Sequence, residues 1–98
     1  MISRFLHEAD VDMANAVAFY NAQRAGLGAE FNAEVESAVA RIVQYPLAWS
    51  PISKRCRSCQ TRRFPYNVIF RVLESEILIV AIAHQRRRPG FWEERISE

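Results

Sequence analysis

The sequence contains little lysine, glycine, proline or cysteine. Its 98 residues include three glycines, four prolines and two cysteines, and Lys54 is the only lysine among thirteen basic residues. So little glycine and proline excludes collagen-like and low-complexity chains. No apolar run approaches the roughly 18 residues of a membrane-spanning helix, and the first ten residues lack the segments of a secretory signal. We therefore expect a soluble, cytoplasmic protein with no membrane partner.

The two cysteines, Cys56 and Cys59, form one C-x-x-C pair inside the basic segment KRCRSCQTRR. A zinc site normally needs four ligands, and His7 and His84 are the only histidines that could complete one. A thioredoxin-type pair would lie at the start of a helix that follows a strand. We predict ordinary thiols, no metal site and no cofactor, with a redox or metal role as the alternatives.

Hydrophobic residues make up 50% of the chain and charged residues 24%. This is the balance of a globular protein, with enough apolar surface to offset the entropy lost on ordering the chain. A chain of this length rarely holds more than one core. We therefore expect one folded domain over residues 1–98.

Charge is divided unevenly along the chain. Up to Ser53 there are three basic and six acidic residues, a net charge of −3, whereas from Lys54 there are ten basic and five acidic residues, a net charge of +5. Arginine is suited to forked contacts with carboxylate or phosphate and to stacking on flat rings. The C-terminal half therefore favours an anionic partner, with a solvated basic face as the alternative.

The N-terminal half predicts one strand and two helices. Residues 2–7 alternate as a short strand, and Asp10 is placed to cap the helix that follows, which Gly26 and Gly28 would end. The second helix opens at Leu27 and has the clearest apolar stripe in the chain, and Pro46 must end it by about residue 45. So short a connection makes the two helices an antiparallel hairpin.

The C-terminal half predicts a loop over residues 46–58, with Trp49 packed at the edge of the core, and then three strands over 60–64, 67–73 and 77–84. The last strand is apolar on both faces, so we place it inside the sheet. A short segment follows from Pro89. The predicted class is α+β: a small, antiparallel-rich sheet in the order β-α-α-β-β-β, with the N-terminal helical hairpin on one face.

Several stretches carry a family likeness in their order and spacing. They are a first helix with Asp, Ala and Tyr, a second helix that opens at LG and closes at a proline, and then RRFPYNVIFRV, ILIVAIAH and RRPGFW. From about Ala9 to Arg95 the chain resembles the RelE/ParE superfamily of type II toxin–antitoxin toxins. The resemblance implies a toxin that a co-encoded antitoxin holds inactive, its tail wrapped over the toxin surface in a hetero-oligomer.

The superfamily divides by target. RelE-like members cut messenger RNA in the ribosomal A site, and ParE-like members poison DNA gyrase. The segment AHQRRRPGFW, residues 83–92, looks closer to the ParE-like and plasmid-stabilisation branches. The resemblance therefore implies a gyrase inhibitor that acts by binding. A ribosome-dependent mRNA endoribonuclease is the alternative, and a decayed toxin or non-toxic interaction module is a third possibility.

Under the ribonuclease alternative, cleavage without a metal needs a proton carrier and cations around the phosphate. Arg62 and Arg86 match arginines of the family's motifs and would supply the cations. His84 has an ordinary pKa near neutrality and would carry the proton, unless it only donates to a neighbouring carbonyl. The chain departs from the ribonuclease pattern in its single lysine and in having Phe-Trp where those enzymes carry a tyrosine or histidine.

Four further residues are candidates for binding the target or a nucleic acid: Arg63, Arg87, Arg88 and Trp92. If residues 60–64 form a strand, Arg62 and Arg63 face opposite sides of the sheet, and the one outside the site would pair with a helix carboxylate or with antitoxin. Trp92 would stack on a base, or pack with Phe91 at the core edge against Trp49 or the helices. We expect Arg62, His84 and Arg86 to line one concavity that faces an anionic partner.

Overall fold

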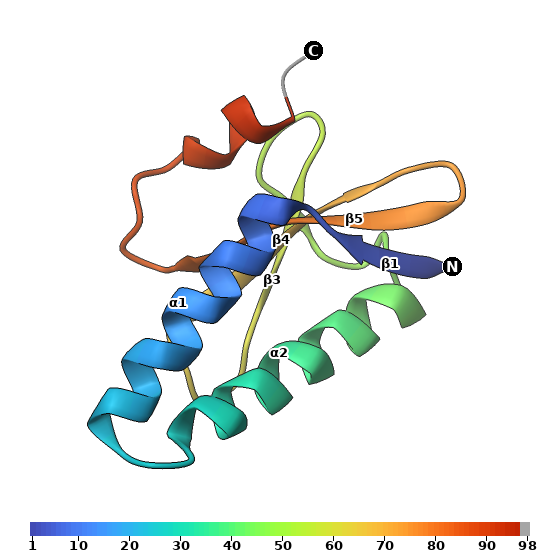
Figure 1. The fold of residues 1–98 in the computed structure, drawn as a ribbon. Helices are drawn as coiled ribbons and strands as arrows, with labels where there is room; N and C mark the ends of the chain where they lie inside the picture. Colours follow the sequence, from blue (N-terminus) through green and yellow to red (C-terminus); the bar gives the residue numbers. More distant parts are fainter. Residues whose placement is uncertain (97–98) are drawn as a thin grey trace.

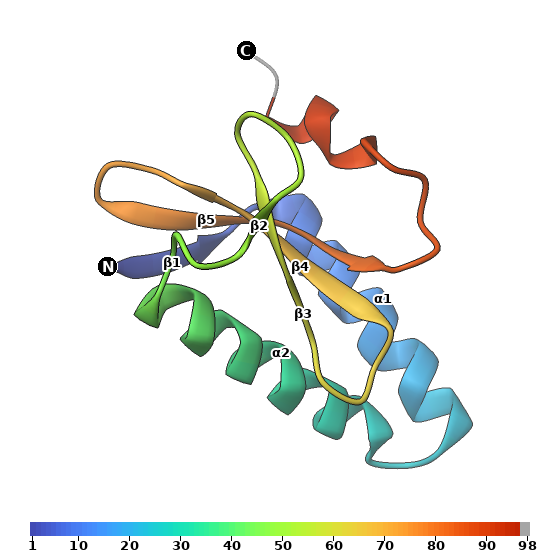
Figure 2. The same ribbon diagram turned by 180° about the vertical axis from the view of Figure 1, so that it is seen from behind.

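The computed structural model describes residues 1–96, which fold as a helical hairpin on one face of a five-stranded sheet (Figure 1). In chain order the elements are β1 (Ile2–Phe5), α1 (His7–Gln23), α2 (Leu27–Gln44), β2 (Ser50–Pro51), β3 (Arg57–Gln60), β4 (Tyr66–Val72), β5 (Glu76–His84) and the short 3₁₀ helix η1 (Phe91–Arg95). Seen from behind, η1 lies on the side of the sheet away from α2 (Figure 2).

The strands lie in the order β1-β5-β4-β3-β2. β1 pairs with β5 in parallel and every other pairing is antiparallel. The chain between β1 and β5 contains both helices and the other three strands, which is the kind of long connection that a parallel pair requires. The α+β class, the antiparallel-rich sheet and the interior position of β5 are confirmed.

The helical hairpin is confirmed, but the prediction that Asp10 caps α1 is wrong. The helix begins at His7, with Leu6 at the N-cap in an extended conformation and without a side-chain cap, so Asp10 lies in the first turn. Pairing in the sheet sets the point at which the helix begins. The backbone N–H of Leu6 donates to the carbonyl of Ile79 at 2.9 Å, and this bond fixes where β1 stops. Gly26 adopts a left-handed conformation at φ 88°.

The second helix agrees with its prediction at both ends. α2 runs from Leu27 to Gln44, just before Pro46, and buries one stripe: Gly28, Phe31, Val35, Ala38 and Ile42. Gly28 lies inside this helix and does not end the first one. A Cβ on Gly28 would come within 2.7 Å of the Val17 carbonyl and the Asn21 side chain, so this glycine allows α1 and α2 to approach closely.

The predicted strand over residues 60–64 is wrong, because β3 ends at Gln60 and the chain then turns. The Thr61 hydroxyl donates to the Phe64 carbonyl at 2.9 Å, and the Thr61 N–H donates to the Tyr66 carbonyl at 2.9 Å. Arg63 has a positive φ of 70°, which a strand residue does not have. Arg62 and Arg63 are therefore neighbours in an exposed turn and do not alternate across the sheet.

A short strand also lies in the segment predicted to be a loop. Ser50 and Pro51 form β2, which pairs with Ser58 and Arg57 at the edge of the sheet. An edge position is where a strand tolerates proline, which has no N–H to donate. Trp49, just before it, packs against the core as predicted.

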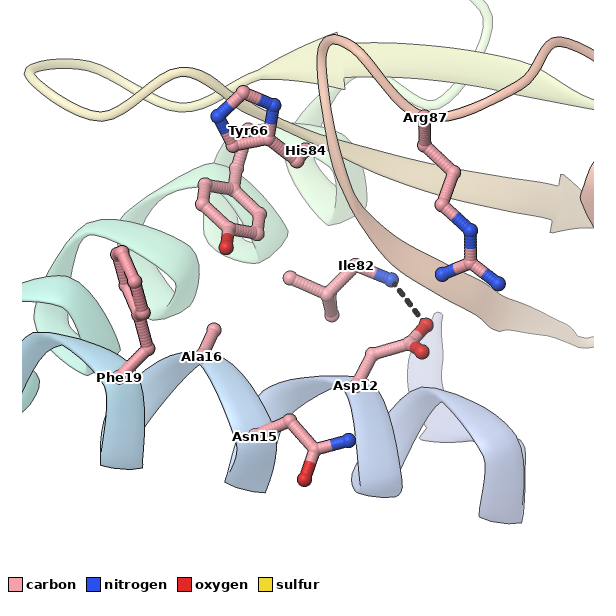
Figure 3. A pocket seen from close by; sticks show the side chains of 8 residues that line it. All are labelled: Asp12, Asn15, Ala16, Phe19, Tyr66, Ile82, His84 and Arg87. Atoms are coloured by element: carbon pink, nitrogen blue, oxygen red, sulfur yellow. Dashed lines mark hydrogen bonds between the residues drawn. The ribbon is translucent and has the colours of Figure 1, made fainter.

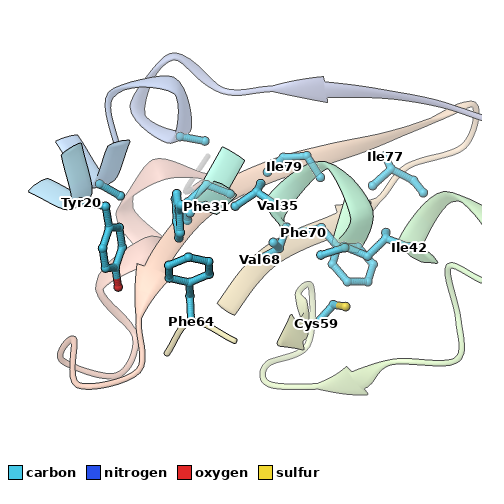
Figure 4. Close-up of a cluster of buried hydrophobic side chains, with 14 residues drawn as sticks. Tyr20, Phe31, Val35, Ile42, Cys59, Phe64, Val68, Phe70, Ile77 and Ile79 are labelled. Atoms are coloured by element: carbon cyan, nitrogen blue, oxygen red, sulfur yellow. The ribbon is translucent and has the colours of Figure 1, made fainter. Parts of the chain in front are cut away.

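The sheet separates two hydrophobic clusters. The helix-side core lies under α1 and α2 and includes Phe31, Phe64 and Phe70 (Figure 4). The tail-side core lies on the opposite face, where Phe91, Trp92 and Ile96 cover β5.

A register shift in β5 decides which side chains reach each core. Ile69 pairs with Ala81 but Phe70 pairs with Ile79, so Val80 is an extra residue in β5. Val80 and Ala81 both belong to the tail-side core, and Ile82 returns to the helix side. Because strand side chains alternate, the shift also brings His84 to the helix side.

Candidate functional site

A pocket of about 260 Å³, here called the His84 pocket, lies between α1 and the ends of β4 and β5 (Figure 3). Its lining combines apolar and aromatic side chains with one cation and one carboxylate: Asp12, Asn15, Ala16, Phe19, Tyr66, Ile82, His84 and Arg87. Small concave sites with a few convergent polar groups are the usual places where proteins bind ligands.

His84 and Tyr66 are directly paired at this pocket. Their ring centroids are 5.2 Å apart and the planes meet at 76°. The backbone N–H of Arg86 donates to Nδ1 of His84 at 3.0 Å, so this nitrogen is an acceptor. Burial raises the pKa of the Tyr66 phenol, which therefore stays protonated at neutral pH.

Asp12 is the buried charge of the site. Its carboxylate accepts two bonds from Arg95, at 2.7 and 3.1 Å, and one from the backbone N–H of Ile82 at 3.0 Å. The Asp12 side chain is only 9% exposed and the Arg95 side chain 13%. Arg95 also donates to the Val80 carbonyl at 3.0 Å. The pair therefore provides hydrogen-bond partners for the Val80 carbonyl and the Ile82 N–H, which lie beyond the part of β5 that pairs with β1. It also connects η1 to α1.

Arg87 joins the His84 pocket to a second pocket of about 370 Å³, here called the tail pocket and lined by Glu8, Arg87, Arg88, Phe91, Glu94 and Arg95. The guanidinium carbon of Arg87 lies 3.9 Å from the centroid of the Phe91 ring, and that of Arg95 lies 5.1 Å from the same centroid. Phe91 thus contacts two cations, one from the loop after β5 and one from η1.

The other predicted cations lie elsewhere. Arg63 pairs with Glu30 at 2.7 Å and with Glu34 at 4.0 Å, the helix carboxylate contact foreseen for whichever arginine lay outside the site. The Arg63 guanidinium lowers the pKa of the Glu30 carboxyl. Arg62 and Arg86 are exposed, and neither lines the His84 pocket.

The prediction that Arg62, His84 and Arg86 line one concavity is therefore wrong. The His84 pocket brings His84 together with Arg87 instead. Arg88 lines only the tail pocket. The catalytic roles of Arg62, His84 and Arg86, and the binding roles of Arg63, Arg87 and Arg88, stay predictions.

Trp92 and Phe91 pack on the sheet, 8% and 9% exposed, within the tail-side core. Docking of the last segment onto the fold is confirmed, but Phe91 and Trp92 pack on the second face of the sheet and not in the cluster that contains Trp49 and the helix residues. So little exposed indole surface disfavours the prediction that Trp92 stacks on a base.

The two cysteines lie in different clusters, Cys56 in the tail-side core and Cys59 in the helix-side core. Burial raises the pKa of both thiols. A protonated, buried thiol is a poor nucleophile and a poor metal ligand, which agrees with the prediction of ordinary thiols. Within residues 1–96 no three His, Cys, Asp or Glu side chains group together as a metal site would require. In the same range, the helices lack the length and apolarity needed to cross a membrane.

Comparison with known proteins places this chain in a family. The solved structure titled "Chromosomal ParDE TA system from P. aeruginosa" superposes with a TM-score of 0.76 at 19% identity, over 86% of this chain and 95% of that one. This likeness shows that the two chains share a fold. Residues 4–89 match the family described as "ParE toxin of type II toxin-antitoxin system, parDE". The chain belongs to this ParE toxin family.

Two curated relatives share the name Toxin ParE2 and come from two strains of Mycobacterium tuberculosis, CDC 1551 / Oshkosh and ATCC 25618 / H37Rv. Each is 34% identical to this chain over 67 residues. The matched region covers 68% of this chain and 64% of the relative's length.

Proposed function

We propose that residues 1–98 form one toxin domain of a type II toxin–antitoxin module, which binds and inhibits DNA gyrase and is neutralised by a co-encoded antitoxin in a hetero-oligomer. The observation that carries the proposal is the family match over residues 4–89. The 34% identity to proteins named Toxin ParE2 supports the ParE-like branch. Gyrase is the target that the likeness to ParE toxins implies.

The test is a supercoiling assay with purified gyrase and the purified chain. We expect the chain to inhibit supercoiling, the antitoxin encoded beside it to restore activity, and Arg24→Ala to inhibit as the wild type does. Arg24 is a matched control because it is an exposed arginine whose ion pair, with Glu30, lies outside both pockets. Undisturbed supercoiling at a large excess of chain would remove gyrase as the target.

Ribosome-dependent cleavage of messenger RNA is the second candidate, and one observation favours it. The His84 pocket brings a histidine, a protonated tyrosine and an arginine to one surface, side chains that can carry protons and stabilise a charged phosphate. Primer extension on translated messages would map any cuts, and His84→Ala should abolish them if His84 carries the proton. Cuts that persist in this variant would remove that role.

Expression in a host cell separates both candidates from a decayed toxin or non-toxic interaction module. We expect growth to stop on expression and to resume when the antitoxin is supplied. Normal growth at a confirmed level of soluble protein would favour the non-toxic module.

A further inference from the structure

The three consecutive arginines after β5 differ in how they are held. Arg86 is exposed and contributes only its backbone N–H to His84, and Arg88 is exposed at the rim of the tail pocket. Arg87 alone lines both pockets, and its guanidinium stacks over Phe91 at 3.9 Å. Stacking uses the face of a guanidinium, and its N–H donors lie in the plane at its edge. The Phe91 ring therefore holds Arg87 by the guanidinium face and does not cover the edge that carries the donors.

A chain of contacts leads from Arg87 to the centre of the fold. Phe91, the ring under Arg87, is 9% exposed and also touches Arg95. Arg95 is fixed by its two bonds to Asp12 and by its bond to the Val80 carbonyl. Asp12 itself is anchored on α1 and on the N–H of Ile82. The position of Arg87 thus depends on an ion pair that does not touch it.

The lining of the His84 pocket indicates which anion this arginine binds. Phe19, 56% exposed, presents an apolar ring beside Ala16 and Tyr66. The one charged residue that α1 contributes to the pocket lining is Asp12, which is paired with Arg95. From there to Arg24 the sequence has no charged residue, so the rest of the helix wall is uncharged. An apolar wall beside one forked cation fits a single carboxylate next to an apolar side chain.

A nucleic acid fits this surface poorly. Its backbone carries one negative charge about every 1.7 Å of duplex and needs several free cations in a row. Here Arg95 is already paired with Asp12, and Arg87 is the one arginine among the lining residues of the His84 pocket. The pocket therefore offers one guanidinium fork, which suits a single carboxylate better than a row of phosphates.

We propose that the His84 pocket is an antitoxin-docking site, in which Arg87 binds a carboxylate of the antitoxin and Phe19 contacts the apolar side chain beside it. Phe91, Arg95 and Asp12 are the positioning residues that hold Arg87 toward the pocket. This inference rests on the proposed function, since it names the contact through which the antitoxin neutralises the toxin.

The test is calorimetric titration of the chain with the purified antitoxin encoded in the same operon. Arg87→Ala should raise the dissociation constant by roughly 30-fold or more, as truncation of one partner of a desolvated charge pair does. Arg87→Lys keeps the charge but loses the forked pair of N–H donors and the stacking on Phe91. It should raise the dissociation constant by roughly 5-fold. Arg24→Ala, which removes an exposed arginine outside both pockets, should bind within about 2-fold of the wild type.

Each other outcome decides against the site. Binding by Arg87→Ala within about 2-fold of the wild type would overturn it while leaving the toxin–antitoxin pair intact. If Arg87→Ala loses gyrase inhibition but keeps antitoxin affinity, the pocket belongs to the target. If Arg87-dependent binding is found for a single-stranded RNA probe and not for antitoxin, the ligand assignment is wrong. A wild-type chain that binds no antitoxin would overturn the proposed pairing as well.

The positioning roles can be tested in the free protein. A methylene group held over an aromatic ring is shifted upfield in the proton NMR spectrum, so the Arg87 δ-protons report its stacking on Phe91. We expect this shift in the wild type and its loss in Asp12→Asn and in Phe91→Leu, together with a roughly 5-fold or greater loss of antitoxin affinity in both variants. Phe91→Leu keeps an apolar side chain in the tail-side core, so it serves even if Asp12→Asn fails to fold.

In the Arg87→Ala background, Asp12→Asn should cause no further loss of affinity, because its effect passes through Arg87. Losses that multiply would show that Asp12 acts independently and would overturn its positioning role.

Discussion

The two faces of the sheet are covered in different ways. The helix-side core contains 14 buried residues, most of them from two long helices and the central strands. The tail-side core contains nine, and its cover is the five-residue η1 and Ile96. A five-residue helix has little propensity of its own, so polar contacts supplement its burial. These are Arg95 to Asp12 and Arg55 to the Ile96 carbonyl at 3.1 Å.

The comparison shows that apolar packing and specific polar bonds can each hold a covering segment on a face of the same sheet. On the helix side, we expect the loss of one polar contact to change stability little, because apolar burial dominates. On the tail side, a few polar bonds hold η1, whose residues line the tail pocket. Substitutions can test this difference, starting with the largest expected effect.

The largest effect is expected for Phe31→Ala in the helix-side core. Phe31 is fully buried, and its ring centroid lies 5.2 Å from those of Tyr20 and Phe64 and 4.8 Å from that of Tyr66. Its removal should lower the free energy of unfolding by about 3–5 kcal/mol, from lost burial and the cavity left behind. Urea denaturation measures this, and a loss below about 1 kcal/mol would contradict the assignment of this ring to the centre of the core.

Asp12→Ala should lower the free energy of unfolding by about 3 kcal/mol, because it leaves Arg95 buried without its partner. The loss should be local as well as global, since the Ile82 amide would exchange its hydrogen faster once its acceptor is gone. Asp10→Ala is the matched control: Asp10 is exposed in the first turn of the same helix, and its loss should change stability by about 0.5 kcal/mol or less. Equal effects of the two substitutions would argue that the tail is not held by the Asp12–Arg95 pair.

Gly28→Ala should lower stability by about 1–3 kcal/mol, since the new Cβ would meet the fixed carbonyl of Val17 at 2.7 Å. The backbone must shift, and the bond from the Gly28 N–H to Asn21 Oδ1, now 2.8 Å, should weaken. Gly26→Ala meets no atom within 4 Å and tests the cost of the positive φ alone. Thermal unfolding of both variants separates steric contact from backbone strain, and a neutral Gly28→Ala would show that the helices can separate at no cost.

The smallest effect is expected for Arg63→Gln, which breaks an exposed pair. The Arg63 hydrogen bond holds the pKa of Glu30 below its ordinary value, so the pair stabilises the fold above that value and loses its contribution as the pH falls through the lowered pKa. The melting temperatures of wild type and variant should therefore differ slightly at pH 7 and converge in acid. A difference that grows on acidification would have the wrong sign for this mechanism.

Much of the fold could be predicted because the signals are local. Pro46 cannot continue a helix, so the end of α2 follows from one residue. The unbroken apolar run of β5 marks an interior strand, which was correct. Asp10 was assigned as a cap because its chemistry suits one, yet the bond between Leu6 and the distant Ile79 started the helix earlier. The turn at Arg63 was missed because its positive φ follows from the Thr61 bonds and not from a glycine.

The candidate site was only partly predictable. The arginine cluster and His84 were singled out from the sequence, because charge and the capacity of an imidazole to exchange protons are properties of single side chains. The pairing of Asp12 with Arg95 was not foreseen, since 83 residues separate them and no local pattern connects them. Tyr66 and Phe19 join the pocket for the same reason, as neighbours in space but not in sequence.

The sequence by itself determined where the long helix ends, which strand lies inside the sheet and where the cations gather, because these follow from hydrogen-bonding capacity, hydrophobicity and charge along the chain. Only the tertiary structure decided which arginine faces the pocket. One extra residue at Val80 moves His84 to the helix side, and the position of Arg87 is set by stacking on a ring that a distant ion pair holds. Such choices depend on contacts between segments that meet only after the chain has folded.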